Sequence, residues 1–447
     1  MRVGILGSDV GAYATAAFLK RLLPSSEIVM FSKGLTERPS FSSPWIRNDK
    51  KGRLCVMKLG RDILEMGESE FVVSKVNSTI SLVGTNGVVD HFPSFKTVVK
   101  NLHAIAFEPF RRRSIGNGDV SVSAFLEQRF GKSFSQRYAN MITMSMIGQE
   151  NAELVSVHTL LPKMARSAAS HRSVLLGPLW AMVGGHHDRQ TSYYTNVMDH
   201  LWQKLASGGK YVSMAPRLDL SLFYDRLEDH VVSTCRLEKS EVEKIEGKNI
   251  STLDGSCHSL DVLVTSLRPD RLVALTHSQA QVPTEAVARL SEYKTMYSNR
   301  LSCAIGMGDS VQINQSTGEK IIPQSCMFKV ESGVVVDILS DQVGGDGEEI
   351  PACKIGSNQA LLELNNWRRQ QALDIQFVGK WYYTPTGSVT DMVADADRLA
   401  FLISKRYDGF PYKRIENEFS SDYISRSDRS LDLKYEDELH GSTRLVL

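Results

Sequence analysis

The sequence predicts an α/β protein that has a discontinuous Rossmann-type sheet domain and an inserted domain of helices and antiparallel strands. Three observations predict this fold class. A strand, a glycine turn, a helix and a second strand follow one another within residues 2–31. Apolar residues at helical spacing dominate the middle of the chain. A buried strand and a helix return near the end, at residues 375–379 and 390–406.

The first thirty-one residues have the size of one βαβ unit. Residues 2–6 (RVGIL) predict a short buried strand, and residues 7–12 (GSDVGA) predict a turn. Residues 13–23 predict a helix that the following proline ends. Residues 27–31 (EIVMF) then predict the second strand of the unit.

The middle of the chain carries three segments with apolar residues at helical spacing, at residues 122–130, 134–147 and 194–205. Asp119 is the predicted N-cap of the first helix, and Gly131 is its predicted C-cap. These segments predict that the inserted domain is rich in helices.

Apolar and polar residues alternate from residue 231 to residue 265, with a turn at Asp254 and Gly255. This pattern predicts a small antiparallel sheet that leads into a buried strand. Because Rossmann-type elements occur at both ends of the chain, the last strand must return to the first sheet. The predicted domains are 1–78, 205–270 and 355–405 for the sheet domain, 79–204 and 271–354 for the inserted domain, and 406–447 for a polar tail.

The charge of the chain is balanced, with 52 Lys and Arg against 51 Asp and Glu in 447 residues. A nucleic-acid binder would show a basic excess, so nucleic acid is not an expected partner. No apolar run reaches the ~18–20 residues of a membrane-spanning helix. Six scattered cysteines lack metal-binding spacing and predict reduced thiols. Only Met1 precedes the first strand, so no cleavable presequence is expected.

The glycine turn after the first strand departs from the pattern of a dinucleotide-binding loop. Such a loop uses three small positions, for the tight turn, for the approach of the pyrophosphate and for helix packing. Gly7 and Ala12 fit the first and third positions, but Asp9 stands at the second, with Gly11 as an extra glycine. The Asp9 side chain would fill the space of a phosphate and repel its charge. A Rossmann-like packing element that binds no nucleotide stays open as an alternative.

Several later segments resemble, in their order and spacing, segments of one known family. Residues 119–177 contain DVSVSAFLEQRFGKSFSQ and MIGQENAELVSVHTLLPKM, and residues 171–177 read HRSVLLG. Residues 261–267 read DVLVTSL, and residues 350–356 read IPACKIG. These segments resemble the animal mitochondrial type of protoporphyrinogen oxidase, within the FAD-dependent amine oxidase-like superfamily. The matches cover most of residues 1–405.

The resemblance implies an activity, a cofactor and a location. The activity is the FAD-dependent, oxygen-linked, six-electron oxidation of protoporphyrinogen IX to protoporphyrin IX in haem biosynthesis. The location is the mitochondrial inner membrane, where a homodimer would be bound peripherally through the inserted domain, which also holds the substrate. The implied FAD-binding residues are Gly7, Ser8, Asp9, Val10, Gly11, Ala12, Ser32, Val242, Ser266, Val389, Thr390 and Asp391. Because Asp9 lacks the expected glycine and Ser32 the expected carboxylate, FAD binding is predicted to be weak.

Departures from the family cluster where the substrate would bind. The family's arginine after a Leu-Pro-x-Gly-Leu turn is missing from the matching stretch FPSFKT. We therefore expect Arg47 or Lys96 to be the cationic anchor for the substrate propionates, with Phe328 as an aromatic neighbour. No catalytic acid–base pair and no metal ligand is predicted.

Two alternatives to this function stay open. One is a non-catalytic paralogue that binds porphyrin or a partner protein and has lost tight FAD binding. The other is a different flavin amine oxidase. The basic run Arg111–Arg113 is interpreted as a solvated face, with a membrane-surface or propionate-binding patch as its alternative.

Overall fold

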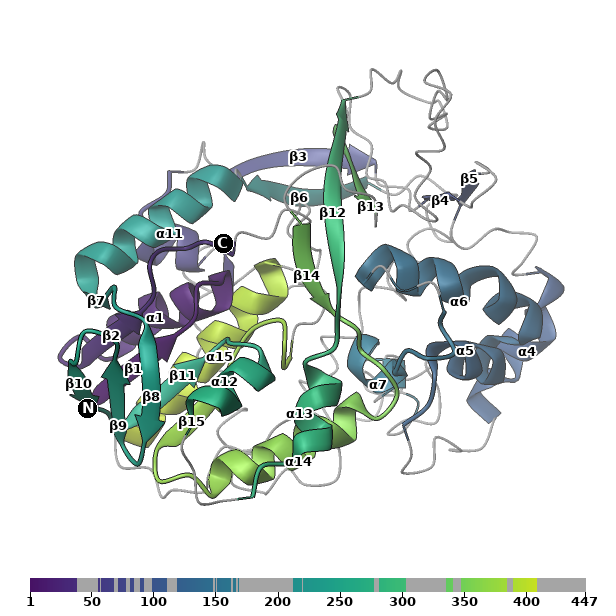
Figure 1. Ribbon diagram of the computed structural model, residues 1–447. Helices are drawn as coiled ribbons and strands as arrows, with labels where there is room; N and C mark the ends of the chain where they lie inside the picture. Colours follow the sequence, from purple (N-terminus) through teal and green to yellow (C-terminus); the bar gives the residue numbers. More distant parts are fainter. Residues whose placement is uncertain are drawn as a thin grey trace. The chain divides into compact units, whose positions relative to one another are not determined.

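The computed structural model of the chain divides into two compact units, which are described separately (Figure 1). Unit 1 comprises Met1–Val72, Pro216–Glu292 and Ser357–Leu447, and unit 2 comprises Val73–Ala215 and Tyr293–Gly356. The structure describes residues 1–37, 55–56, 58–67, 71–77, 81–83, 89–91, 99–110, 119–147, 149, 151–161, 164–165, 168, 212–218, 220–276, 281–302, 335–340, 347–383 and 389–407. The domain boundaries expected from the sequence stay a prediction.

A five-stranded sheet forms the centre of unit 1 (Figure 1). Its strands, in spatial order, are β15 (Asp374–Phe377), β11 (Val262–Thr265), β1 (Arg2–Leu6), β2 (Glu27–Phe31) and β7 (Arg236–Glu238). All neighbouring strands are parallel. The predicted α/β fold class with a Rossmann-type parallel sheet is therefore confirmed. The return of the last strand to this sheet is confirmed as well, because β15 pairs with β11.

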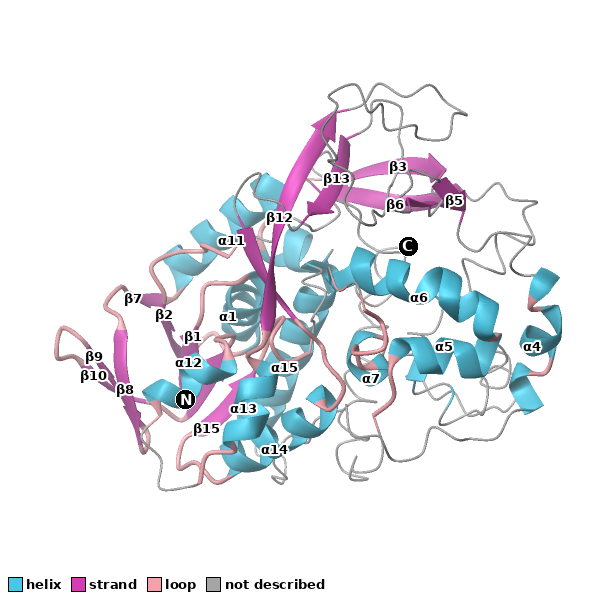
Figure 2. Cartoon of the chain, turned by 45° about the vertical axis from the view of Figure 1, so that its right-hand side comes forward, coloured by secondary structure: helices cyan, strands magenta, loops and turns pink. Residues whose placement is uncertain are grey.

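Helices bury both faces of this parallel sheet. In β2, Ile28 and Met30 belong to one core, whereas Val29 and Phe31 belong to the other. A strand buried on both faces is a continuous apolar run, as expected of parallel sheets. The first core is covered by α1 (Val10–Leu22), α11 (Leu220–Thr234) and α15 (Val389–Tyr407). The second core is covered by α12 (Pro269–Leu275), α13 (Thr284–Leu290) and α14 (Ser357–Arg369), which Figure 2 shows together.

Helix α11 corrects one expectation from the sequence. The alternation at residues 231–237 predicts a strand, but residues 231–234 form the last turn of α11, and only β7 is extended. The cause is an apolar stripe of Phe223, Leu227 and Val231, which recurs every four residues and is fully buried. Burying this stripe along a helix outweighs the local strand preference of two adjacent valines.

A three-stranded antiparallel sheet shares the second core of unit 1. It consists of β8 (Val242–Glu246), β9 (Asn249–Thr252) and β10 (Cys257–Ser259). The predicted antiparallel sheet is therefore confirmed from residue 242 onward. Its predicted turn is fixed by Asp254, whose carboxylate accepts hydrogen bonds from the Thr252 hydroxyl at 2.7 Å and the Ser256 N–H at 3.0 Å.

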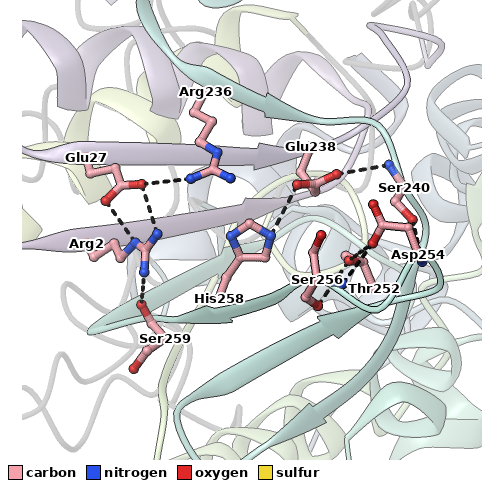
Figure 3. Close-up of polar contacts among 10 residues, drawn as sticks. All are labelled: Arg2, Glu27, Arg236, Glu238, Ser240, Thr252, Asp254, Ser256, His258 and Ser259. Atoms are coloured by element: carbon pink, nitrogen blue, oxygen red, sulfur yellow. Dashed lines mark hydrogen bonds and ion pairs between the residues drawn. The ribbon is translucent and has the colours of Figure 1, made fainter.

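Polar contacts join this small sheet to the parallel sheet (Figure 3). The Arg2 guanidinium lies 2.9 Å from the Glu27 carboxylate, so it ties β1 to β2, and it also donates to the Ser259 carbonyl at 3.4 Å. The ring of His258, on β10, lies with Nε2 3.2 Å from a carboxylate oxygen of Glu238, on β7. These contacts fix the small sheet against β1 and β7.

Unit 2 contains helices and antiparallel strands. Its helices are α4 (Leu102–Ala106), α5 (Val122–Phe130), α6 (Lys132–Ile147) and α7 (Val157–Leu160), with a 3₁₀ turn, η3, at Glu108–Phe110. One antiparallel sheet has three strands in the order β13 (Val335–Ser340), β12 (Tyr293–Ser302) and β14 (Gly347–Pro351). A second sheet is the pair β4 (Ser81–Val83) and β5 (Val89–His91). The pair β3 (Phe71–Asn77) and β6 (Val212–Leu218) lies where the chain passes between the units, and a π-helical turn, η1, spans Lys58–Ile63 in unit 1.

The helices expected at residues 122–130 and 134–147 are present, and the one expected at residues 194–205 lies outside the described residues. The N-cap of α5 is Ser121, which accepts a hydrogen bond from the Ala124 N–H at 3.0 Å, and not Asp119 as predicted. The Asp119 carboxylate instead accepts from the Gly356 N–H at 2.6 Å. It is therefore used for a long-range contact within unit 2.

Arg368 fastens α14 to the edge strand β15. Its side chain is buried, and its guanidinium donates to the Asn365 side chain at 2.6 Å, to the Ile375 carbonyl at 2.6 Å and to the Gln376 side chain at 3.0 Å. The same group lies 5.2 Å from the centre of the Phe377 ring. A buried guanidinium is tolerated only when its donors are paired in this way.

We expect Arg368→Met to lower the free energy of unfolding by about 3 kcal/mol, because it removes these donors from buried acceptors. Denaturant unfolding followed by circular dichroism measures the loss. Arg271→Met, at an exposed arginine on α12, is the matched control and should change the free energy by less than about 0.5 kcal/mol. Equal losses in the two variants would contradict the role assigned to Arg368.

Candidate functional site

Three strand ends meet at one edge of the parallel sheet in unit 1. Gly7 directly follows β1, and Ser266 directly follows β11. Gly379 lies two residues after the end of β15. The Ser266 N–H donates to the Leu6 carbonyl at 3.1 Å, which holds two of these ends together. Ligands of open α/β sheets bind outside the carboxyl ends of the strands, where the connections diverge. This edge is such a point, because β1 connects to β2 on one side and pairs with β11 on the other.

Two positions at this edge require glycine. Gly7 has a φ of +151° and Gly379 a φ of +91°, which are values that side chains disfavour. A Cβ atom on Gly7 would lie 2.0 Å from the Ser266 hydroxyl oxygen, and one on Gly379 would lie 2.5 Å from Asp9 Oδ2. The two glycines thus let the backbone approach Asp9 and Ser266 closely.

The Asp9 side chain is the N-cap of α1. Its Oδ1 accepts a hydrogen bond from the Ala12 N–H at 2.8 Å, and the residue is only 3% exposed. This cap lets α1 begin at Val10, three residues before the start at Tyr13 that the sequence predicts. Helix N-termini favour a negative charge because their first N–H groups lack partners within the helix. Here a residue of the chain itself supplies that charge.

Two charged residues from other segments surround Asp9. Glu37 follows β2, and its N–H donates to the Ser8 carbonyl at 3.0 Å. Lys380 follows β15, and its buried ammonium lies 3.2 Å from a Glu37 carboxylate oxygen. Burial, and then the charge of Glu37, raise the pKa of Asp9 to about 7, although the Ala12 N–H, Lys380 and Ser266 act in the opposite direction. Near neutral pH the Asp9 carboxyl is therefore divided between its neutral and ionised forms.

Ser32 uses its hydroxyl entirely within the fold. The hydroxyl accepts hydrogen bonds from Tyr13 Oη at 3.3 Å and from the Gly34 N–H at 3.2 Å, and it donates to the Gly34 carbonyl at 2.8 Å. A serine hydroxyl has one donor and two acceptor positions. All three are occupied, so a ribose hydroxyl would have to displace a contact of the protein.

The structure brings together the residues of the glycine turn and Ser266. Val10, Gly11 and Ala12 form the buried first turn of α1 beside Asp9. Sequence reasoning missed Glu37, Gly379 and Lys380 as members of this cluster. The glycine directly after the last buried strand was the one available signal, because it marks a close approach at the carboxyl edge of the sheet.

The other residues expected near a flavin belong to β8 and α15 of unit 1. Val242 begins β8 and packs against the second core. Val389 is buried in the first core, Thr390 follows it in α15, and Asp391 lies in the first turn of that helix. Helix α15 packs directly against α1. Their role as cofactor ligands stays a prediction.

The expected substrate anchors Arg47, Lys96 and Phe328 lie outside the described residues. Nothing in the structure therefore bears on the propionate-binding role assigned to the two cations, or on the aromatic contact assigned to Phe328.

The fit of FAD to this edge is decided by Asp9. A FAD pyrophosphate would need the free N–H groups at the start of α1. Gly7 and Gly379 provide the close backbone approach, but Asp9 already accepts the bond of the Ala12 N–H. An ionised carboxylate there would also repel the pyrophosphate. With Asp9 ionised, these residues do not fit the pyrophosphate of FAD.

Comparison with known proteins gives a fold match without a sequence match. No family model matches the chain, and no curated protein matches its sequence. A candidate protoporphyrinogen oxidase from Exiguobacterium sp. 255-15 superposes with a TM-score of 0.55 at 12% identity, over 91% of this chain and 99% of that one.

Two other solved structures match over a similar extent. Reduced UDP-galactopyranose mutase superposes with a TM-score of 0.51 at 11% identity, over 91% of this chain and 94% of that one. Cyclohexylamine oxidase from Brevibacterium oxydans IH-35A superposes with a TM-score of 0.51 at 12% identity, over 91% and 99%. At these identities the likeness establishes the fold alone: the chain shares its α/β architecture with these enzymes.

We expect Asp9→Asn to stabilise the protein at neutral and alkaline pH. The folded state raises the pKa of Asp9 from its ordinary 3.8 to about 7, so the folded state holds the proton more tightly. The contribution of Asp9 to the free energy of unfolding is then full below about pH 4. It falls by up to ~1.4 kcal/mol per pH unit as the pH rises to about 7, and it is level above that pH. Asparagine cannot ionise, so the variant lacks this loss.

Chemical denaturation of both proteins at several pH values measures the difference. The advantage of Asp9→Asn should grow from about pH 4 to about pH 7 and then level off. A difference that is constant over this range would show that the Asp9 carboxyl does not resist ionisation in the folded protein.

Proposed function

We propose that the chain is a flavin-dependent oxidoreductase whose substrate is protoporphyrinogen IX, oxidised to protoporphyrin IX with FAD and molecular oxygen. The observation that carries the proposal is the edge at which β1, β11 and β15 end with two obligatory glycines, the arrangement of a dinucleotide site. The fold shared with a candidate protoporphyrinogen oxidase supports it. The ordered segments that resemble the same family favour this substrate over an amine. Because Asp9 occupies the start of α1, the cofactor is proposed to be weakly held.

A second candidate function is supported by a specific observation. Asp9 fills the pyrophosphate position and Ser32 has no free hydrogen-bonding capacity. Both features favour a non-catalytic paralogue that binds a porphyrin or a partner protein. The flavin content of the purified protein, measured by visible absorbance, separates the two candidates, since only the first requires flavin for its activity.

The substrate carries two propionates, and we propose Arg47 or Lys96 as their anchor. Losing one charge-assisted contact costs roughly 1.5–3 kcal/mol, which corresponds to about a ten- to hundredfold loss in substrate affinity. We expect this loss for Arg47→Ala or Lys96→Ala in fluorescence-monitored oxidation of protoporphyrinogen with added FAD. Lys248→Ala, at an exposed lysine between β8 and β9, is the matched control and should behave as the wild type.

The result divides the alternatives. Robust turnover that neither substitution affects would show that the anchor is placed wrongly. No turnover above the spontaneous rate, together with no bound flavin, would favour the non-catalytic paralogue.

We further propose that the protein binds peripherally to the mitochondrial inner membrane, as a homodimer. Four apolar side chains of one short segment of unit 2, Val99, Leu102, Phe107 and Phe110, are exposed, and the two phenyl rings lie 6.4 Å apart; this apolar patch supports membrane binding. The run Arg111–Arg113 follows this patch directly in the sequence and would attract anionic lipid. No helix within the described part of the chain is long and apolar enough to cross a membrane.

We expect Phe107→Ser/Phe110→Ser to weaken binding to vesicles of phosphatidylcholine and phosphatidylglycerol by at least about tenfold, because each buried phenyl group contributes roughly 1.5–3 kcal/mol. Vesicle co-sedimentation measures the change. Leu253→Ser, at an exposed leucine of unit 1, is the control and should leave vesicle binding unchanged. Equal binding by the double variant and the wild type would exclude this patch as the membrane contact.

A further inference from the structure

We propose that Asp9 is an internal anion of helix α1, and that a dinucleotide pyrophosphate can replace it only when the Asp9 carboxyl carries a proton. The inference rests on the proposed function, which supplies the class of ligand, a flavin dinucleotide. It concerns how that ligand binds to the site and not the reaction that follows.

The Asp9 carboxylate and an incoming pyrophosphate compete for one donor. The Ala12 N–H is bonded to Asp9 Oδ1 at 2.8 Å. An anion bound at a helix N-terminus takes its bonds from these same N–H groups. An ionised carboxylate and a pyrophosphate are both acceptors only, so they cannot share the donor and they repel each other. The ligand therefore has to remove the charge of Asp9 or move its side chain.

The other carboxyl oxygen of Asp9, Oδ2, is the position for the proton. Asp9 Oδ2 makes no hydrogen bond of regular geometry with the described residues, although the residue is almost fully buried. It faces the Gly379 backbone, where the absence of a side chain leaves it room. A protonated carboxyl has one O–H donor. With the proton on Oδ2, Asp9 changes from a competitor of the phosphate into a donor for it.

The charges around Asp9 also bear on the binding of a pyrophosphate. The groups that face it are the Ala12 N–H on α1, Ser266 after β11, Lys380 and Tyr382 after β15, and Glu37 after β2. Glu37 and Lys380 form an ion pair at 3.2 Å, and the charge of Glu37 acts on Asp9 more strongly than the opposite charge of Lys380. A pyrophosphate would add further negative charge to this buried cluster. Uptake of a proton by Asp9 offsets one of these charges.

Tyr382 and Asp270 do not share this titration. The Tyr382 hydroxyl donates to the Leu267 carbonyl at 2.7 Å, and burial raises the pKa of Tyr382 well above its ordinary value, so the phenol stays neutral. Asp270 also acts on Tyr382; burial alone would raise its pKa, but the bonds from Arg268 and the Arg271 N–H lower it overall. Asp9, with a pKa of about 7, changes charge near neutral pH, whereas the shifts of Tyr382 and Asp270 move their pKa values away from neutrality.

The experiment measures FAD affinity of the full chain by fluorescence between about pH 6 and about pH 8.5. If the ligand binds only the protonated form, the wild-type Kd should be level below pH 7 and should rise by about tenfold per pH unit above it. Calorimetry in buffers of different ionisation enthalpy should show uptake of close to one proton per FAD at pH 8 and close to none at pH 6. Riboflavin, which has no phosphate, should bind without this pH dependence.

Asp9→Asn isolates the charge, because asparagine keeps an oxygen to cap α1 but cannot ionise. We expect its Kd for FAD to stay level over the pH range, within about threefold of the wild-type value at pH 6, with no proton uptake. Asp9→Gly removes the side chain and should also bind FAD without pH dependence. Asp254→Asn is the matched control at an exposed turn in unit 1, and it should keep the wild-type pH profile.

Wild-type binding that is detectable but level with pH would overturn the inference, because Asp9 would then leave the site while ionised. An equal slope in Asp9→Asn and the wild type would overturn it as well. These results are compatible with porphyrinogen oxidation, and pH-linked binding without oxidation would refute the proposed function alone. Absence of FAD binding in the wild type and both Asp9 variants at every pH would refute both.

Discussion

The structure of unit 1 depends on the close meeting of three strand ends at Gly7, Ser266 and Gly379. A parallel sheet cannot be closed by short hairpins, so each strand must arrive from a distant part of the chain. Here the three strands β1, β11 and β15 come from residues far apart in the sequence. The absence of a side chain at both glycines lets their ends approach within contact of one another. The order of the sheet and the discontinuity of the unit follow from this convergence.

The same convergence determines the environment of Asp9. Because the strand ends are close and helices cover both faces, the start of α1 lies in a buried position. An N-cap side chain contributes about 1 kcal/mol to the stability of a helix. Desolvation opposes this gain as soon as the carboxyl ionises, which is why its pKa rises so far. The structure thus accepts a titrating group at its centre in exchange for a satisfied helix terminus.

Features set by neighbouring residues could be predicted from the sequence, and features set by distant contacts could not. The bounds of β1 and β2 agree with the sequence to the residue, because apolar runs and a glycine turn define them locally. The end of α11 was predicted wrongly, since burial of its stripe depends on a core that the local pattern does not contain.

The candidate site shows the same division. Asp9 is visible in the sequence as a departure from a glycine pattern, but its role as the cap of α1 requires the backbone geometry. Lys380 and Glu37 reach Asp9 from segments more than three hundred residues apart, so no local motif announces them. That Ser32 is a weak ribose ligand stays a prediction, and the contacts of its hydroxyl with Tyr13 and Gly34 are visible only in the fold.

An internal anion changes what the fold requires of a ligand. When a glycine stands at this position, the N–H groups at the start of the helix have no partner in the chain, and a bound phosphate completes them. With Asp9 in place, the Ala12 N–H of α1 has a partner in the chain without a ligand. The sheet and both cores therefore can persist whether or not a dinucleotide is bound. This independence is compatible with a weakly held cofactor and equally with a chain that does not bind one. In the proposal above, the affinity of the site for a dinucleotide is decided by whether the Asp9 carboxyl is protonated and whether its side chain can move.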